Sequence, residues 1–82
     1  MVLELTDRAR EALLASQSAA RRFDPGAHVR LFLAGGQLRT ALVDAAEPGD
    51  AVLTIEGLTL FVQPGIAGSI DAGEHNALTL SP

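Results

Sequence analysis

The chain has 82 residues, enough for one domain, and we expect a single domain over residues 1–82. Ten acidic residues against six basic ones give a formal net charge of −4, which argues against nucleic-acid binding because that needs a basic surface. The sequence contains neither cysteine nor lysine. Thiolate nucleophiles, cysteine-held metal clusters and lysine-bound cofactors are therefore excluded.

The opening residues and the apolar runs indicate a protein outside the membrane. VLELTDRARE is charged and amphipathic, unlike a signal peptide, and the longest apolar run falls far short of the roughly twenty residues of a membrane span. The absence of cysteine fits a reducing compartment. We expect a soluble cytoplasmic protein. With no disulfide to stabilise so small a domain, self-association as a homo-oligomer is an open expectation.

The N-terminal segment predicts a short strand over residues 2–5 followed by a helix that ends near Ala20. Thr6 stands at the expected N-cap, and Asp7 adds negative charge to the first turn. The expected inner face consists of Ala9, Ala12, Leu13, Ser16 and Ala20. The expected solvent side consists of Arg8, Glu11, Gln17 and Ser18.

The middle of the chain predicts two β-hairpins. Strands are expected over residues 28–34 and 37–44 around a two-glycine turn, and over 51–55 and 58–62 around a second turn. The last two of these strands are apolar on both faces, which predicts that both are sandwiched between other elements.

The C-terminal part predicts one helical turn over residues 66–70, a polar turn over 71–76 and a final strand over 77–80. Together the elements predict an α+β domain with one main N-terminal helix and about six short strands in a mixed sheet or sandwich.

Five short segments, in their order and spacing, resemble the HesB/IscA-type family of A-type iron–sulfur carriers. The segments are LELTDRAREAL at 3–13, VRLFLAGGQ at 29–37, GDAVLTIEGLTLFVQP at 49–64, GSID at 68–71 and LTLSP at 78–82. The resemblance covers nearly the whole chain and implies a HesB-like fold.

The chain departs from this family at the positions that hold the cluster. The family uses three cysteines, and Gln37 occupies the position of the first; the two C-terminal ones have no counterpart up to Pro82. The segment between Pro64 and Ala77 is also shorter than the family's. Because a glutamine amide cannot replace a thiolate in iron–sulfur chemistry, the resemblance implies a cysteine-free branch that keeps the fold and binds no cofactor.

Few side chains are candidates for catalysis or metal binding. Asp71, Glu74 and His75 cluster in the expected polar turn and are weak candidates for a divalent metal, although such residues also collect in turns because turns are wet. His28 begins a strand, where an edge residue is a simpler interpretation than a catalytic base. With two histidines and no serine in an elbow-like context, a hydrolytic triad has little support.

Two phenylalanines lie opposite the most regular apolar stripe of the expected sheet. Phe32 and Phe61 are either buried by the helix and a second sheet, or mark a surface for a partner or a second copy. In the second case Arg30 and Arg39 would frame that surface.

We therefore predict a non-catalytic domain that serves as an interaction or accessory module, recognising an unidentified protein partner through its sheet face. The alternative is an accessory protein of iron–sulfur cluster assembly that docks to a partner supplying the ligands. A third hypothesis is a small hydrolase or metal enzyme built on His28 or on the turn around His75.

Overall fold

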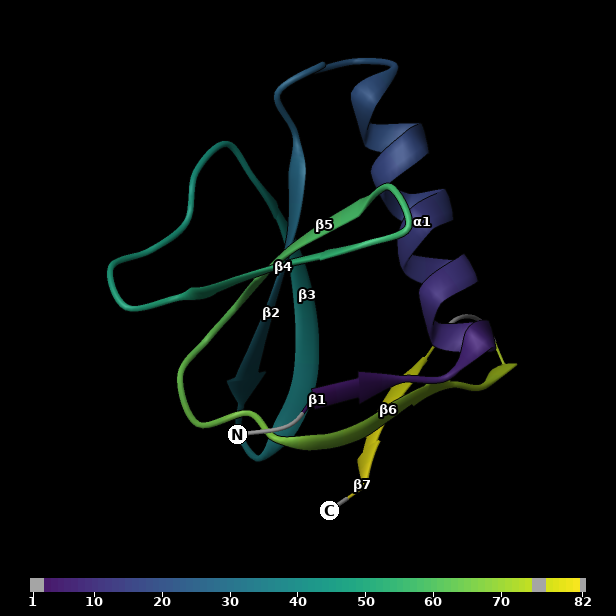
Figure 1. The fold of residues 1–82 in the computed structure, drawn as a ribbon, viewed down its shortest axis with the longest axis vertical. Helices are drawn as coiled ribbons and strands as arrows, with labels where there is room; N and C mark the ends of the chain where they lie inside the picture. The colour runs from purple at the N-terminus through teal and green to yellow at the C-terminus, as the bar shows by residue number, and fades with distance from the viewer. Residues whose placement is uncertain (1–2, 75–76, 82) are drawn as a thin grey trace.

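Seven strands and one helix make up the part of the chain that the computed structural model describes, residues 3–74 and 77–81 (Figure 1). The elements are β1 (Leu3–Leu5), α1 (Asp7–Arg21), β2 (His28–Ala34), β3 (Gln37–Val43), β4 (Ala51–Ile55), β5 (Leu58–Val62), β6 (Gly68–Ala72) and β7 (Leu78–Ser81). The predicted helix and hairpins are confirmed. The strand predicted over 37–44 ends one residue earlier, at Val43, and the final strand, predicted over 77–80, runs over 78–81. None of the described helical residues forms a segment long and apolar enough to cross a membrane.

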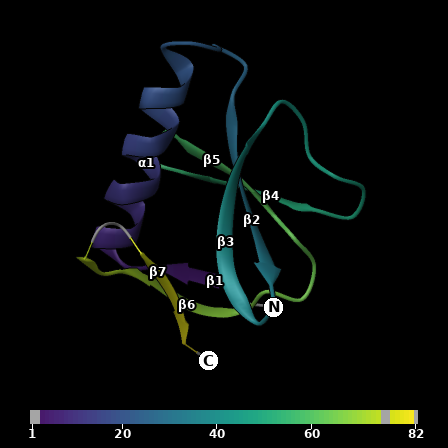
Figure 2. The same cartoon turned by 180° about the vertical axis from the view of Figure 1, so that it is seen from behind.

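The strands form two mixed sheets. The four-stranded sheet has the order β3-β2-β5-β4, with β2 and β5 parallel, and the three-stranded sheet has the order β1-β6-β7, with β1 and β6 parallel. Figure 1 and, from behind, Figure 2 show α1 standing beside the larger sheet while the smaller sheet closes one end of the molecule. The architecture is the expected α+β class.

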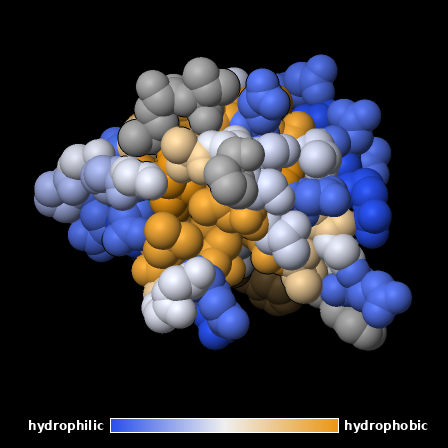
Figure 3. Space-filling model, turned by 90° about the horizontal axis from the view of Figure 1, so that it is seen from below, coloured by the Kyte–Doolittle hydropathy of each residue, from blue (hydrophilic) through white to orange (hydrophobic). Residues whose placement is uncertain are grey.

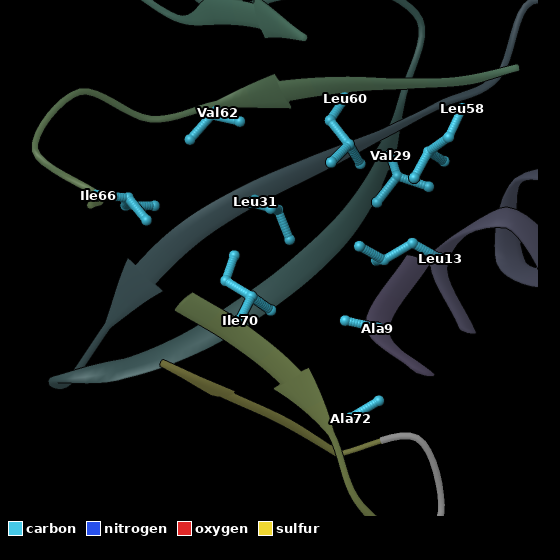
Figure 4. Packing of buried hydrophobic residues seen from close by; sticks show 10 residues of the cluster. All are labelled: Ala9, Leu13, Val29, Leu31, Leu58, Leu60, Val62, Ile66, Ile70 and Ala72. Atoms are coloured by element: carbon cyan, nitrogen blue, oxygen red, sulfur yellow. The ribbon is translucent and has the colours of Figure 1, made fainter. Parts of the chain in front are cut away.

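The core lies on one face of the four-stranded sheet. Its buried cluster consists of Ala9, Leu13, Val29, Leu31, Leu58, Leu60, Val62, Ile66, Ile70 and Ala72 (Figure 4). In β2 the alternation of side chains turns Val29 and Leu31 inward, and each such burial is worth about 1.5–3 kcal/mol. The opposite face of this sheet, here the outer face, is covered by neither α1 nor the three-stranded sheet.

The prediction for residues 66–76 was wrong in part, because residues 68–72 form β6 and not a helical turn leading into a polar turn. Residues 68–70 pair in parallel with β1, and residues 69–72 pair with β7. Ile70 and Ala72 are buried by this pairing. The deciding partner is far away in sequence, so no local pattern indicated it.

The prediction that β4 is sandwiched was also wrong. β5 is central and buried along most of its length, but β4 is an edge strand, and Val52 is 58% exposed. Both strands are apolar on both faces, so only the strand order distinguishes the central strand from the edge strand.

On the helix, two side chains exchange their expected environments. Gln17 is 3% exposed, and it donates through Nε2 to the carbonyl of Gly57 (3.0 Å) and accepts through Oε1 from the N–H of Thr59 (3.0 Å). Ser16, expected to face inward, is exposed and donates to the carbonyl of Ala12. A buried glutamine is stable here because both ends of its amide have backbone partners on the β4–β5 turn.

Candidate functional site

The outer face of the four-stranded sheet is the surface that the two phenylalanines predicted. From the strand register, it carries His28, Arg30 and Phe32 of β2, Arg39, Ala41 and Val43 of β3, Val52 and Thr54 of β4, and Thr59 and Phe61 of β5. It therefore brings together both phenylalanines and both arginines that the sequence analysis singled out.

Phe61 is buried, but not by the helix and second sheet as one of the two interpretations expected. The His28 ring stacks on it with 4.9 Å between ring centroids, and only 8% of Phe61 is exposed. The Nδ1 atom of His28 is buried and has no hydrogen-bond partner among the described residues. In a catalytic triad, an acidic side chain accepts a hydrogen bond from the histidine and fixes its orientation. No described side chain does this for His28, so the geometry favours a packing role for His28.

Arg30 does not frame an open patch, because its guanidinium is held by Asp50. Nε donates to Oδ2 at 2.8 Å and Nη2 donates to Oδ1 at 3.0 Å. The Asp50 side chain is fully buried and also accepts from the N–H of Glu47 at 3.0 Å. The hydrogen bonds from Arg30 lower the pKa of Asp50, and Asp50 in turn raises the pKa of Arg30. This pair fixes the β3–β4 loop to β2.

The same guanidinium lies 5.7 Å from the ring centroid of Phe32, which is half-buried. On the outer face, His28 and Phe61 are therefore engaged with each other, and Arg30 is engaged with Asp50 and Phe32. Among its large apolar residues, Val52 is the one that is mostly exposed.

A groove of about 630 Å³ runs between β3 and β7. The residues that line this β3–β7 groove are Leu33, Gly36, Gln37, Leu38, Arg39, Ala77, Leu78, Thr79 and Leu80. Figure 3, seen from below, shows apolar surface gathered at this end of the molecule. The groove lies next to the β2–β3 turn, where Gly35 and Gly36 both take positive φ as a two-residue hairpin requires.

Gln37, the residue that the family resemblance aligns with the first cysteine, lies in the wall of this groove. It is exposed, and its Oε1 accepts a hydrogen bond from Nη2 of Arg39 at 3.0 Å. The side chain is a neutral amide already engaged with its neighbour, so it offers no ligand suited to an iron–sulfur cluster.

The predicted metal candidates are not assembled into a site within the described residues. Asp71 lies in β6, where Oδ1 accepts from Oγ1 of Thr6 (2.7 Å) and from the N–H of Ala72 (2.8 Å). These hydrogen bonds, that from Thr6 foremost, lower the pKa of Asp71. Glu74 is exposed, and His75 lies outside the described residues. Over residues 3–74 and 77–81, no three histidine, aspartate or glutamate side chains come together as metal ligands.

One exposed apolar surface was missed from the sequence. Phe23 is 91% exposed and Leu42 is 60% exposed, and both border a hollow of about 220 Å³ at the end of α1. Asp24 and Asp44 lie on its rim, and the Asp24 carboxylate raises the pKa of Asp44, because it accepts a hydrogen bond from the protonated form and repels the charged form. In the sequence, Phe23 stands between two arginines and a turn. This pattern is consistent with an exposed apolar residue, but it is equally consistent with a residue that ends the helix.

The order of the strands and the placing of the helix can be compared with solved structures. The fold is similar to that of SufA. The crystal structure of Escherichia coli SufA, a protein involved in the biosynthesis of iron–sulfur clusters, superposes with a TM-score of 0.69 over 99% of this chain and 85% of the SufA chain, at 23% sequence identity. The HesB-like fold implied by the sequence is thereby confirmed. No family model matches the chain, and no curated protein matches it.

Proposed function

We propose that this protein is a non-catalytic accessory module that uses a SufA-like scaffold to bind a protein partner. The observation that carries the proposal is the retention of this fold in a sequence without a single cysteine. A cluster carrier needs thiolate ligands, and the resemblance to the A-type carriers aligns Gln37 with the first of them. Without cluster ligands, the fold can instead serve to bind a protein partner.

The carboxylates with lowered pKa values support a binding role over catalysis. Asp50 and Arg30 neutralise each other, and Asp71 is engaged by Thr6. Catalytic groups generally combine a perturbed pKa with access to a substrate. Here the two carboxylates with lowered pKa values hold the fold together, because each bonds to a group on another part of the chain.

The β3–β7 groove suits a partner better than the outer face does. The groove is concave, is lined by half-buried and exposed leucines, and includes Leu33, which is 39% exposed. On the outer face the two phenylalanines are buried or half-buried and Arg30 is paired. Binding sites combine concavity with apolar lining and a few polar groups, and the groove has all three.

The test is affinity capture from an extract of the protein's own cells, with matched variants on the two surfaces. We expect the wild type and Val52→Asp to capture the same specific protein, and Leu33→Asp to lose it. Both substitutions place a carboxylate at an exposed aliphatic position, so each controls for the other. Absence of any specific partner would refute the proposed function, whereas loss with Val52→Asp alone would assign binding to the outer face.

The second candidate is an accessory role in iron–sulfur cluster assembly, with the partner supplying the thiolates. The position of Gln37 in the groove, together with the likeness to SufA, favours it. Under anaerobic conditions with ferrous iron and sulfide, we expect the isolated chain to stay colourless. If the role is real, the chain alters the rate at which a cysteine-bearing A-type carrier acquires the visible absorbance of a cluster, and Leu33→Asp abolishes that effect. No effect of the wild type on that rate would exclude this candidate.

A further inference from the structure

We propose that the β3–β7 groove binds an extended acidic segment of the partner by strand addition. The inference rests on the proposed function and specifies what kind of segment the partner presents. It follows from three features of the groove: two unpaired strand edges, an apolar lining and one arginine without an acidic partner.

Both strands that border the groove are sheet edges. β3 pairs only with β2, β7 pairs only with β6, and no backbone hydrogen bond between β3 and β7 occurs in the described part of the chain. Each strand therefore presents backbone N–H and C=O groups without a partner strand. Such edges accept an additional strand readily.

The lining shows that the groove follows these edges and not a face of either sheet. Successive side chains of a strand point to opposite faces, yet three consecutive residues of β3, 37–39, and three of β7, 78–80, all border the groove. A second hollow, of about 240 Å³, continues along β3 to Thr40 against Leu78. An extended segment of about five residues fits this length, at roughly 3.3 Å per residue.

The side chains define the chemistry of the segment. Leu33, Leu38, Leu78 and Leu80 provide apolar contact for alternate side chains of an added strand. Arg39 is the one charged residue in the lining, and its hydrogen bond to the neutral Gln37 is the only polar contact of its side chain within the described residues.

Arg39 differs in this respect from Arg10 and Arg30, although Arg8, Arg21 and Arg22 likewise have no acidic partner within salt-bridge distance among the described residues. Arg10 pairs with Glu56 and Asp7, and Arg30 pairs with Asp50, whereas no acidic group of the described residues lies within salt-bridge distance of Arg39. A carboxylate on the added strand would form a charge-assisted hydrogen bond with it. An antiparallel pairing of β3 with β3 of a second copy, centred near Arg39, would bring two like charges close together. This favours a different chain as the occupant.

The experiment titrates ¹⁵N-labelled full-length protein with a blocked hexapeptide of alternating valine and threonine that carries one central glutamate. We expect chemical-shift changes at the amides of residues 36–40 and 78–81. Replacing the glutamate by lysine should weaken binding by about two- to fivefold, the effect of a partly exposed ion pair, and that difference should shrink as salt is added. Methylating alternate peptide nitrogens should abolish binding, because it removes the donors that strand addition needs.

A charge exchange provides the decisive comparison. Arg39→Glu should lose its preference for the glutamate peptide and prefer the lysine peptide, whereas Arg22→Glu, at an exposed position outside the groove, should behave like the wild type. Equal binding of the methylated peptide, no preference between the two charges, or shift changes confined to other residues would each overturn the inference. A concentration-dependent dimer with β3 and β7 at its interface would also overturn it, by assigning the groove to a second copy.

The two proposals can fail separately. If Leu33→Asp loses a captured partner but no peptide perturbs the groove, strand addition is wrong and the accessory role stands. If the peptides bind as expected and the cell extract yields no specific partner, the groove chemistry stands and the accessory role is wrong.

Discussion

Removal of the Gln17 side chain tests how the helix is attached to the β4–β5 turn. In Gln17→Ala, the N–H of Thr59 and the carbonyl of Gly57 lose their partners. Gly57 is exposed, so water can replace its lost donor, and the main cost is the Thr59 donor at about 1–3 kcal/mol. Loss of the one buried methylene, Cγ, adds roughly 0.8 kcal/mol. We expect a total loss of about 3 kcal/mol.

That loss is a large share of the stability of a domain of this size, for which about 4–12 kcal/mol is typical at 0.05–0.15 kcal/mol per residue. Urea denaturation followed by far-ultraviolet circular dichroism measures the change in the free energy of unfolding. The slope of that free energy against urea concentration should be unchanged if only stability changes. The thermal midpoint should fall by roughly 12–24 °C, at about 4–8 °C per kcal/mol.

Two matched variants separate the causes. Gln17→Leu fills the same space without hydrogen bonds and should keep most of the destabilisation, whereas Ser18→Ala, one residue further on the exposed side, should change stability by less than about 0.5 kcal/mol. If Gln17→Ala and Ser18→Ala prove equally stable, the reasoning about the buried amide is refuted.

Three further predictions use the same urea assay. Phe61→Ala should lower the free energy of unfolding by about 3–5 kcal/mol because the ring is buried. Phe23→Ala should lower it by less than about 0.5 kcal/mol, because that ring is 91% exposed. Similar losses for the two variants would contradict the difference in burial. Thr6→Ala should lose about 1–2 kcal/mol because the N-cap and the bond to Asp71 both disappear, and Thr6→Ser, which keeps the hydroxyl, should recover most of it. The lowered pKa of Asp50 means that its ion pair contributes fully above the unfolded value of about 3.9 and is lost as the pH falls through the folded value. The urea midpoint of Asp50→Asn should therefore fall less steeply below pH 4 than that of the wild type, with Asp71 supplying the remaining slope, and parallel curves would exclude this role.

The elements that the sequence predicted correctly are those set by local rules. Alternation in β2 placed Val29 and Leu31 inward, the paired glycines placed the first hairpin turn, and Thr6 caps α1 by accepting from the N–H of Ala9 at 3.2 Å. Each of these features depends on residues within a few positions of one another, so a pattern in the chain is sufficient to reveal it.

The features that were missed depend on distant partners. Gln17 is buried because a turn 40 residues further along the chain satisfies its amide, and Asp50 is buried because Arg30 lies 20 residues before it. Residues 68–72 form the strand β6 because residues 68–70 pair with β1, far away in sequence. In the sequence, a polar residue that is buried by a distant partner cannot be distinguished from one that is exposed to solvent. For this reason the fold was easier to predict than the surfaces that carry the candidate function.

The pairing of β1 with β6 has a consequence for synthesis on the ribosome. Thr6 and Asp71, which are 65 residues apart, meet only after most of the chain has emerged. Until then, Ile70 and Ala72 do not cover the apolar face of α1. β1 and α1 are thus translated before β6 and are secured only after it. Because closing so long a loop is slow, the nascent chain passes through a stage in which chaperones can recognise its uncovered helix.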